Sequence, residues 1–418
     1  MHRRHIVTTE ELQKPPRFFY GYIIVLVAFI IAAVVEGLMF SFGVFFEPLL
    51  TEFGWTRAIT AGAFSLYSLI RIPMFILGGR LTDRFGARQV LSACGFFVGL
   101  GYLLMSQTNT LWQIYLFYGV IVGIGMGLYW VPLLAIVPRW FIKRRALMIG
   151  IVTSGIGVGL LIVPPAANWL ISTYGWRASY LILGGVSMVI IMISAQFLRR
   201  DPYQMGLSPY GASKVKPEDL NLETRAFPVG EAILTRQFWI FCGIYFPWLF
   251  SLSVVLVHMV IHAIGLGMSP ASAASLLTIL GLSGILGRLG MGQLADVIGL
   301  KPVLIASLAL SAVSFLWLLA AGEAWMVYLF AFIFGTAYST FEVLESPIIT
   351  RLFGLSSFGA IFGVIVAISS VGIILGPIVA GHIFDTTDSY QMAFIICVVM
   401  SFISLACAAI LPLGKRGE

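Results

Sequence analysis

Charged residues are scarce in this sequence: 10% of its 418 residues are Asp, Glu, Lys or Arg, whereas 59% are hydrophobic. Soluble globular domains carry about 25% charged residues, so this composition excludes an ordinary water-soluble domain. Twelve apolar stretches are long enough to cross a bilayer core of roughly 30 Å as helices. The predicted membrane-spanning helices cover residues 20–46, 58–79, 90–106, 112–137, 146–167 and 177–197, then 238–262, 272–293, 302–321, 325–350, 358–380 and 390–412.

Cysteine is also scarce, and several motifs are missing. The four cysteines all fall within predicted spans and show no CxxC spacing, so we expect neither a disulfide nor a metal site. They are Cys94, Cys242, Cys397 and Cys407. The sequence has no nucleotide-binding motif, no HExxH motif and no evident serine–histidine pair, and its longest loop is too short for a signalling domain. These absences disfavour a primary pump, a membrane-embedded enzyme and a membrane sensor, and no cofactor is expected.

Positive charge is distributed unevenly along the chain, whose formal net charge is +7. Basic residues collect at alternate ends of the predicted spans, and the opposite loops hold few of them. Under the positive-inside rule, this pattern places both termini and residues 198–236 in the cytoplasm. It favours a multi-pass protein of the plasma membrane, the inner membrane in a prokaryote, over a nucleic-acid-binding protein. The basic residues concerned are Arg3, Arg4, Lys14, Arg17, Arg80, Arg84, Arg88, Arg139, Lys143, Arg144, Arg145, Arg199 and Arg200.

Two blocks of six spans flank the one long polar segment. They repeat at an offset of about 213 residues, because Gly79–Asp83 recurs as Gly292–Asp296 and Pro164 as Pro377. Six is an even number, so both blocks cross the membrane in the same orientation, as in transporters that bind substrate near mid-membrane. We predict an all-α membrane protein of two pseudo-symmetric six-helix bundles. The expected domains are a cytoplasmic N-terminus at 1–19, a first bundle at 20–197, a cytoplasmic linker at 198–236, a second bundle at 237–412 and a cytoplasmic tail at 413–418.

Five charged side chains interrupt the apolar spans. A charge at mid-membrane costs roughly 2.5–3.5 kcal/mol on insertion scales, so such residues usually line a cavity or a pathway. A solute carrier is therefore the leading hypothesis. The five residues are Glu36, Arg71, Arg288, Glu342 and Glu345.

One loop and three further stretches resemble a known family. Residues 79–88, which read GRLTDRFGAR, resemble the signature loop of the major facilitator superfamily. Residues 139–150, Tyr174–Arg177 and 353–385 are similar to its monocarboxylate-porter and oxalate/formate-exchanger branch. The resemblance covers essentially the whole chain. It implies the transport of small organic anions, with a coupled proton or by exchange.

Three positions depart from the pattern of that branch. Animal members carry a lysine late in the first span, where this chain has Phe40. They also carry an aspartate one turn before the arginine of the eighth span, where this chain has Gly284. The exchanger's lysine in the eleventh span has no counterpart within residues 358–380. The residues that the resemblance implies for proton coupling in animal members are therefore missing here. So is the lysine that would pair with an arginine to bind a dianion.

Arg288 is the first candidate for substrate binding, because a guanidinium stays charged and offers a planar fork that pairs with a carboxylate. The resemblance places the family's span-eight arginine here; the alternative is an arginine that extends to the cytoplasmic surface. Arg71 is either a second anion contact or the partner of a buried glutamate. Tyr129 matches a binding tyrosine of the exchanger branch, and the alternative is an interfacial aromatic residue. His258 is a candidate for binding a carboxylate or relaying protons.

The acidic residues are candidates for proton coupling. Glu342 and Glu345 lie three residues apart on one face of a predicted helix. Burial and a like-charged neighbour both favour the protonated carboxyl, which suits a group that takes up and releases a coupled proton. Glu36 in the first span is a third candidate. The alternative is a set of fixed ion pairs with Arg71 or Arg351.

The signature loop is expected to act as a gate. Asp83, Arg84 and Arg88, together with the basic cluster at 139–145, can form inter-helix ion pairs that close the cytoplasmic side. Asp296 takes the corresponding place in the second repeat. The alternative is that these charges only determine the topology.

Together these features predict a secondary active transporter of small organic anions, monocarboxylates such as lactate or pyruvate, coupled to protons and working by alternating access. The expected partners are the carboxylate, protons and the lipid bilayer, and a monomer is expected to suffice. A carboxylate exchanger and a proton-coupled drug antiporter are the alternative functions. We do not expect an enzyme.

Overall fold

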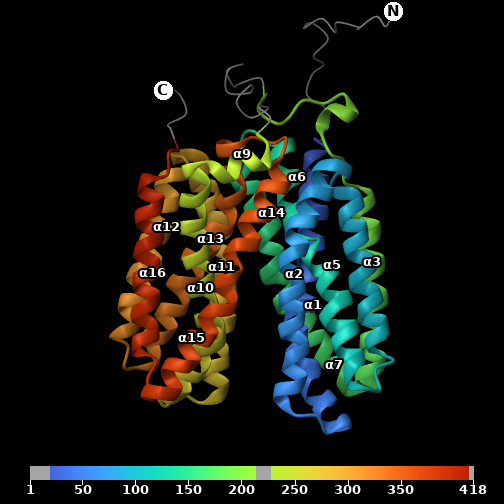
Figure 1. Cartoon of the computed structure of the whole chain (residues 1–418), viewed down its shortest axis with the longest axis vertical. Coiled ribbons are helices and arrows are strands. Elements are labelled where there is room, and N and C mark those ends of the chain that lie inside the picture. The colour runs from blue at the N-terminus through green and yellow to red at the C-terminus, as the bar shows by residue number, and fades with distance from the viewer. Residues whose placement is uncertain (1–18, 213–226, 414–418) are drawn as a thin grey trace, which may run out of the picture.

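The computed structural model describes residues 19–212 and 227–413, and these residues are almost entirely helical (Figure 1). Within them, the one β pairing is an isolated bridge between Phe141 and Tyr210. The predicted all-α membrane fold is confirmed. Most of the predicted N-terminal segment, the middle of the linker and most of the tail lie outside the described residues. The domain boundaries therefore stay predictions.

The first half of the chain crosses the membrane six times. Its longest helix bends at Gly175, whose φ of 79° lies in the left-handed region that favours glycine, so its two arms cross separately. The fourth crossing is divided among four short helices, of which η1 is a π-helix. The elements are α1 (Gly21–Phe53), α2 (Arg57–Phe85), α3 (Ala87–Met105), α4 (Leu111–Ile114), η1 (Tyr115–Val122), α5 (Gly123–Gly127), α6 (Trp130–Trp140) and α7 (Arg145–Gln196).

The second half adds six more crossings, so the described residues contain the twelve that the sequence predicts. Its fifth crossing is divided between two helices that meet at Ser370. Two short helices, η2 (Pro202–Met205) and α9 (Val229–Leu234), lie between the halves in sequence. The elements of the second half are α10 (Arg236–Gly265), α11 (Pro270–Ile298), α12 (Leu300–Leu319), α13 (Ala324–Phe353), α14 (Phe358–Ser369), α15 (Val371–Thr387) and α16 (Gln391–Ile410).

The sequence repeat recurs in the backbone. Gly86 and Gly299, which end α2 and α11, have left-handed φ values of 86° and 99°. Gly54 and Gly267, which follow α1 and α10, have φ values of 64° and 88°. A residue with a Cβ is strained at such angles, which explains glycine at all four turns. The members of each pair are 213 residues apart, so the two halves turn at equivalent places.

The two halves meet at one end of the bundle. Figure 1 shows them joined at the end where α9 lies, which we call the terminal end, and diverging towards the opposite, far end. At the terminal end, the Asp83 carboxylate accepts hydrogen bonds of 3.0 and 2.7 Å from the backbone N–H groups of Gly359–Ala360. The Asp296 carboxylate accepts bonds of 3.1 and 2.9 Å from those of Ala146–Leu147. We call these two contacts the inner gate, after the role that the sequence predicts for Asp83 and Asp296.

Each contact of the inner gate joins a carboxylate of one half to the N-terminus of a helix in the other half. Asp83 lies at the end of α2 and bonds to the start of α14, and Asp296 lies at the end of α11 and bonds to the start of α7. A helix N-terminus has unpaired N–H groups and a positive dipole end, both of which favour a carboxylate. Donors and acceptors are again 213 residues apart, so the inner gate is pseudo-symmetric.

Glycines allow the halves to approach closely beside the inner gate. Gly150 of α7 packs on the carbonyl of Arg288 in α11, and Gly363 of α14 packs on the carbonyl of Phe75 in α2. A Cβ at either glycine would collide with that carbonyl, which is the usual reason for small residues where helices meet in a membrane. Gly150, which packs on the backbone of Arg288, thus lies one helical turn beyond Ala146 of the inner gate.

Candidate functional site

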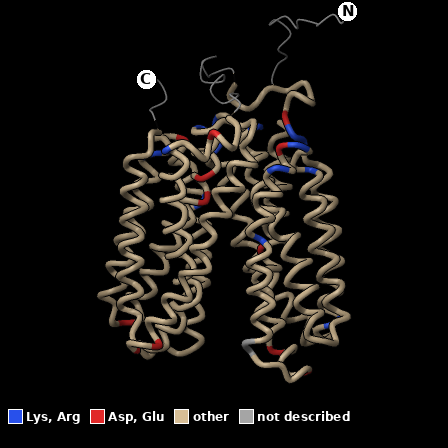
Figure 2. The backbone as a smooth tube through the Cα atoms, in the orientation of Figure 1, with Lys and Arg blue, Asp and Glu red and all other residues tan. Residues whose placement is uncertain are grey.

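Charged residues are concentrated at the terminal end, and only a few lie inside the bundle (Figure 2). One buried group is in the second half. Arg288 of α11 donates to Oε2 of Glu342 on α13, with Nε at 2.9 Å and Nη2 at 2.6 Å, and Nη2 lies 3.3 Å from the Tyr338 hydroxyl. Only 1% of Arg288 is exposed, so its side chain does not extend to the surface as the alternative interpretation required.

Glycines explain how Arg288 lies against α13. A Cβ at Gly287 would collide with the Ser339 hydroxyl, so α11 and α13 approach closely at this level. A Cβ at Gly284 would lie 3.1 Å from Nη1 of Arg288, which shows that the guanidinium occupies the space beside that glycine. The partner of Arg288 therefore comes from another helix, as Glu342 of α13, and not from the preceding turn of α11.

A second buried group is in the first half. The Tyr129 hydroxyl donates to Oε1 of Glu36, which is buried in α1. Arg71 lies at the midpoint of α2, and Nη1 donates to the Met39 sulfur at 3.3 Å. Arg71 interacts electrostatically with Glu36 and Tyr129, but within the described residues it forms no ion pair, and its buried Nε has no hydrogen-bond partner.

The two groups lie where the repeats differ in chemistry. Tyr129 of the first half is equivalent to Glu342 of the second, because they are 213 residues apart. Phe75 of the first half is equivalent in the same way to Arg288 of the second. The structure thus brings Arg288 together with Glu342, and Arg71 with Glu36 and Tyr129, as two clusters rather than one. Sequence reasoning missed Tyr67, although it lies one helical turn before Arg71.

Glu345 has a different environment from Glu342. It is 0% exposed, and both of its carboxyl oxygens lack a hydrogen-bond partner within the described residues. It faces Tyr245 of α10 and Trp130 of α6 without forming a well-aligned hydrogen bond. The next residue, Ser346, donates to the Leu134 carbonyl of the other half at 2.9 Å. Because an unpaired buried carboxylate is costly, a neutral carboxyl fits this site between the halves.

The structure does not place His258 with the charged clusters. Its Nε2 donates to the Pro377 carbonyl of α15 at 3.0 Å, and Nδ1 lies 3.1 Å from the Tyr390 hydroxyl at the start of α16. Both ring nitrogens are therefore used in packing three helices together near the far end. A role for His258 in binding substrate or relaying protons stays a prediction.

The basic residues of the signature loop do not bridge the halves. Arg84 is exposed and lies over the Phe85 ring at 5.0 Å, while Arg88 donates to Gln196 of its own half at 3.0 and 2.6 Å. The cross-half contact comes instead from Arg139, whose Nη2 donates to the Leu355 carbonyl at 2.7 Å. Because a backbone carbonyl has no side-chain signal, the sequence could not identify this partner.

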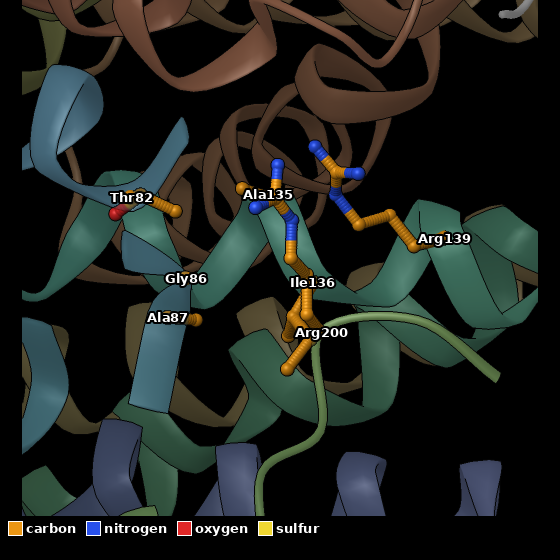
Figure 3. Close-up of a pocket in the computed structure, with 7 residues that line it drawn as sticks. All are labelled: Thr82, Gly86, Ala87, Ala135, Ile136, Arg139 and Arg200. Atoms are coloured by element: carbon orange, nitrogen blue, oxygen red, sulfur yellow. The ribbon is translucent and has the colours of Figure 1, made fainter. Parts of the chain in front are cut away.

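A small cavity of about 10 Å³ lies beside the inner gate (Figure 3). Arg139 and Arg200 extend their guanidinium groups to the same side of it, and Thr82 lies on its opposite wall. Arg200 donates to the Asp83 carbonyl at 3.0 Å, and Arg139 pairs with Asp201 at 3.3 Å. The cavity is the size of one water, so it can hydrate the gate but cannot hold a substrate.

We expect Asp83→Ala to weaken the inner gate, because it leaves the start of α14 without its acceptor. Loss of a capping side chain costs about 0.5–2 kcal/mol, which changes an opening equilibrium by roughly 2- to 30-fold. The measurement is the labelling rate of a cysteine introduced at Ser346, which contacts the other half. Arg84→Ala is the control, because among the described residues the one contact of Arg84 is with Phe85 of its own half. Equal labelling rates in the two variants would mean that Asp83 does not hold the halves together.

The motif Tyr174–Arg177 ties the far end of the first half together. Arg177 pairs with Glu52 of α1, and Nε1 of Trp176 donates to the same carboxylate at 2.5 Å. Arg177 also donates to the Thr108 carbonyl at 3.0 Å. All these partners lie in the first half, so the motif fastens the ends of three crossings to one another and not to the second half.

Comparison with known proteins agrees with this architecture. The model of the Major Facilitator Superfamily matches residues 24–290 and 241–417. Monocarboxylate transporter 4 of Rattus norvegicus is 28% identical over 412 residues, which cover 96% of this chain and 86% of the relative. Monocarboxylate transporter 13 of the same organism is 26% identical over 392 residues, covering 92% and 87%.

Two solved structures share the fold. The proton:xylose symporter XylE matches with a TM-score of 0.74 and 16% identity over 94% of this chain and 96% of its own. The transporter FucP in its outward conformation matches with a TM-score of 0.71 and 16% identity, covering 95% and 100%. At this identity they show the fold alone. The predicted resemblance to the monocarboxylate-porter branch is confirmed by the family match and the curated relatives. The chain belongs to the major facilitator superfamily and is a membrane transporter of its monocarboxylate-porter-like branch.

Proposed function

We propose that this protein transports small monocarboxylates, such as lactate or pyruvate, together with protons. The observation that carries the proposal is the contact between Arg288 and Glu342, in which a carboxylate of the protein already occupies the guanidinium fork. A substrate carboxylate needs the same donors, so it competes with Glu342 for them. Protonation of Glu342 removes its charge and releases Arg288, which couples proton uptake to anion binding.

The charges of the buried clusters also favour a monoanion and one proton. Arg71 and Arg288 carry two positive charges, and ionised Glu36 and Glu342 carry two negative charges, so the clusters are neutral when empty. A monocarboxylate that enters with a proton keeps this balance, whereas a dianion would leave a net negative charge at mid-membrane. Uncompensated charge there is costly, so the loaded site can cross only as a neutral unit.

Two features of the fold support an alternating-access cycle. The inner gate joins the halves at the terminal end, and the ribbons diverge at the far end (Figure 1). In the cycle we propose, substrate enters from the far end, the halves close there, and the inner gate then opens. With the terminal end in the cytoplasm, as the distribution of basic residues favours, this direction is uptake into the cell. A single chain contains both clusters and both gate contacts, so a monomer suffices.

The test is L-lactate uptake into proteoliposomes that contain the purified protein, with protein-free liposomes as the control. We expect an inward proton gradient to drive accumulation above equilibrium, because each lactate enters with a proton. An exchanger would instead require internal carboxylate and would show no dependence on the proton gradient. A drug antiporter would show no lactate uptake. Either of these two results contradicts the proposal.

A further inference from the structure

The arginines of the two clusters, Arg288 and Arg71, differ in how much of the guanidinium is free to bind a ligand. Arg288 is 1% exposed and is held by Glu342 and Tyr338. Arg71 is partly exposed and forms no ion pair within the described residues. Its Nη1 donates to the Met39 sulfur at 3.3 Å, and the neighbouring Tyr67 hydroxyl interacts with it without a well-aligned hydrogen bond. A thioether sulfur is a weak acceptor, so this guanidinium keeps most of its capacity for a carboxylate. In this conformation the anion-receptive side chain is therefore Arg71.

Further unpartnered donors surround Arg71. The hydroxyls of Tyr67 and Tyr118 are buried and lack a hydrogen-bond partner within the described residues, as does Nε of Arg71. Both tyrosines interact electrostatically with Arg71, and the Tyr67 ring lies 5.2 Å from its guanidinium. Buried polar groups are nearly always satisfied, so two tyrosine hydroxyls and one guanidinium N–H without an acceptor point to a missing acceptor. A carboxylate supplies acceptors for all three.

The repeat places this group of donors relative to Arg288. Arg71 is equivalent to Gly284, which lies four residues before Arg288 on α11. Both α2 and α11 run from the far end to the terminal end, so Arg71 lies about 6 Å nearer the far end, at about 1.5 Å per residue. The halves diverge towards that end (Figure 1), whereas the backbone of Arg288 packs on Gly150 of the first half.

We propose that Arg71, Tyr67 and Tyr118 form an entry subsite that receives the substrate carboxylate from the far end before Arg288 does. This inference rests on the proposed function and adds the order in which the two arginines bind the substrate. The carboxylate docks on Arg71 while Glu342 still holds Arg288. It transfers one helical turn inward when Arg288 is released. The rings of Phe42 and Phe75 pack against this subsite, which suits a short organic acid with a small apolar substituent.

The test is the KM for L-lactate measured from each side, in sealed right-side-out and inside-out membrane vesicles. For Arg71→Gln we expect the far-side KM to rise at least tenfold and the terminal-side KM to change less than twofold. A carrier cannot alter the equilibrium, so Vmax/KM falls by the same factor from both sides. A KM that rises on one side only is therefore accompanied by an equal change in the ratio of the two Vmax values. Arg71→Lys, which keeps the charge without the fork, should recover part of the far-side affinity.

Arg236→Gln is the matched control, because it removes an exposed arginine at the start of α10, outside the clusters and the signature loop, and both of its KM values should stay within twofold of wild type. If Arg71→Gln leaves both KM values unchanged, or raises them equally, the entry subsite is wrong while the proposed function stands. If wild-type vesicles do not transport L-lactate, the proposed function fails, and the entry subsite fails with it.

Discussion

Arg288→Gln is expected to lower the Vmax/KM of carboxylate uptake by about 100-fold. The substitution removes a bidentate, charge-assisted partner of the substrate, and such hydrogen bonds are each worth about 1.5–3 kcal/mol, against about 1.4 kcal/mol for a factor of ten. Removing Arg288 also leaves Glu342 buried without its ion pair, which typically costs about 3–5 kcal/mol of stability unless the carboxyl takes up a proton. The measurements are initial uptake rates in proteoliposomes and the Tm of the purified protein.

The double variant Arg288→Gln with Glu342→Gln separates the two effects. It removes both partners of the buried pair, so we expect the Tm to recover towards the wild-type value. Uptake should not recover, because the guanidinium that receives the substrate is still missing. Restored uptake in the double variant would mean that Arg288 serves only to neutralise Glu342, and the substrate would then have to bind elsewhere.

Glu342→Gln alone is expected to uncouple transport from protons. The amide cannot hold Arg288 as a carboxylate does, so the guanidinium is available at every pH. Lactate binding should therefore become independent of pH, whereas in the wild type it weakens as pH rises and Glu342 competes more effectively. An inward proton gradient should no longer drive accumulation, while exchange of external for internal lactate continues. The measurements are the lactate-induced thermal shift from pH 5.5 to 8.5 and the two modes of uptake.

Two further variants locate the proton. Glu47→Gln removes an exposed carboxylate near the far end and should behave as wild type. Glu345→Gln tests the other buried glutamate of α13, which has no arginine partner. If Glu345→Gln abolishes proton-driven accumulation and Glu342→Gln does not, then the coupled proton is carried at Glu345, and competition for Arg288 is not the coupling step.

Much of the fold could be predicted from the sequence because membrane helices satisfy their backbone locally. Continuous apolar stretches set the twelve crossings. The offset between Gly79–Asp83 and Gly292–Asp296 identified the repeat, and the backbone turns repeat at the same offset. The breaks within crossings could not be predicted, because no proline within the π-helix η1 or at the junction at Ser370 marks them in the sequence.

The site was only partly predictable because partners depend on which helices are neighbours. Arg288 and Glu342 were each identifiable as charges in apolar spans, but their pairing requires α11 to pack on α13. Asp83 was identifiable as a gate residue, but its acceptor role towards backbone N–H groups leaves no mark in the side-chain pattern. For His258, the residue type alone suggested a role in substrate binding or proton relay. In the structure, both ring nitrogens contact neighbouring helices instead.

The central claim is that one buried guanidinium is shared between a carboxylate of the protein and the carboxylate of the substrate. The most direct measurement is the proton flux that accompanies a gradient of L-lactate across proteoliposomes without any imposed proton gradient. Competition at Arg288 predicts that one proton moves with each lactate, that no net charge crosses, and that Glu342→Gln abolishes the proton flux. Lactate flux without proton flux in the wild-type protein would contradict this account.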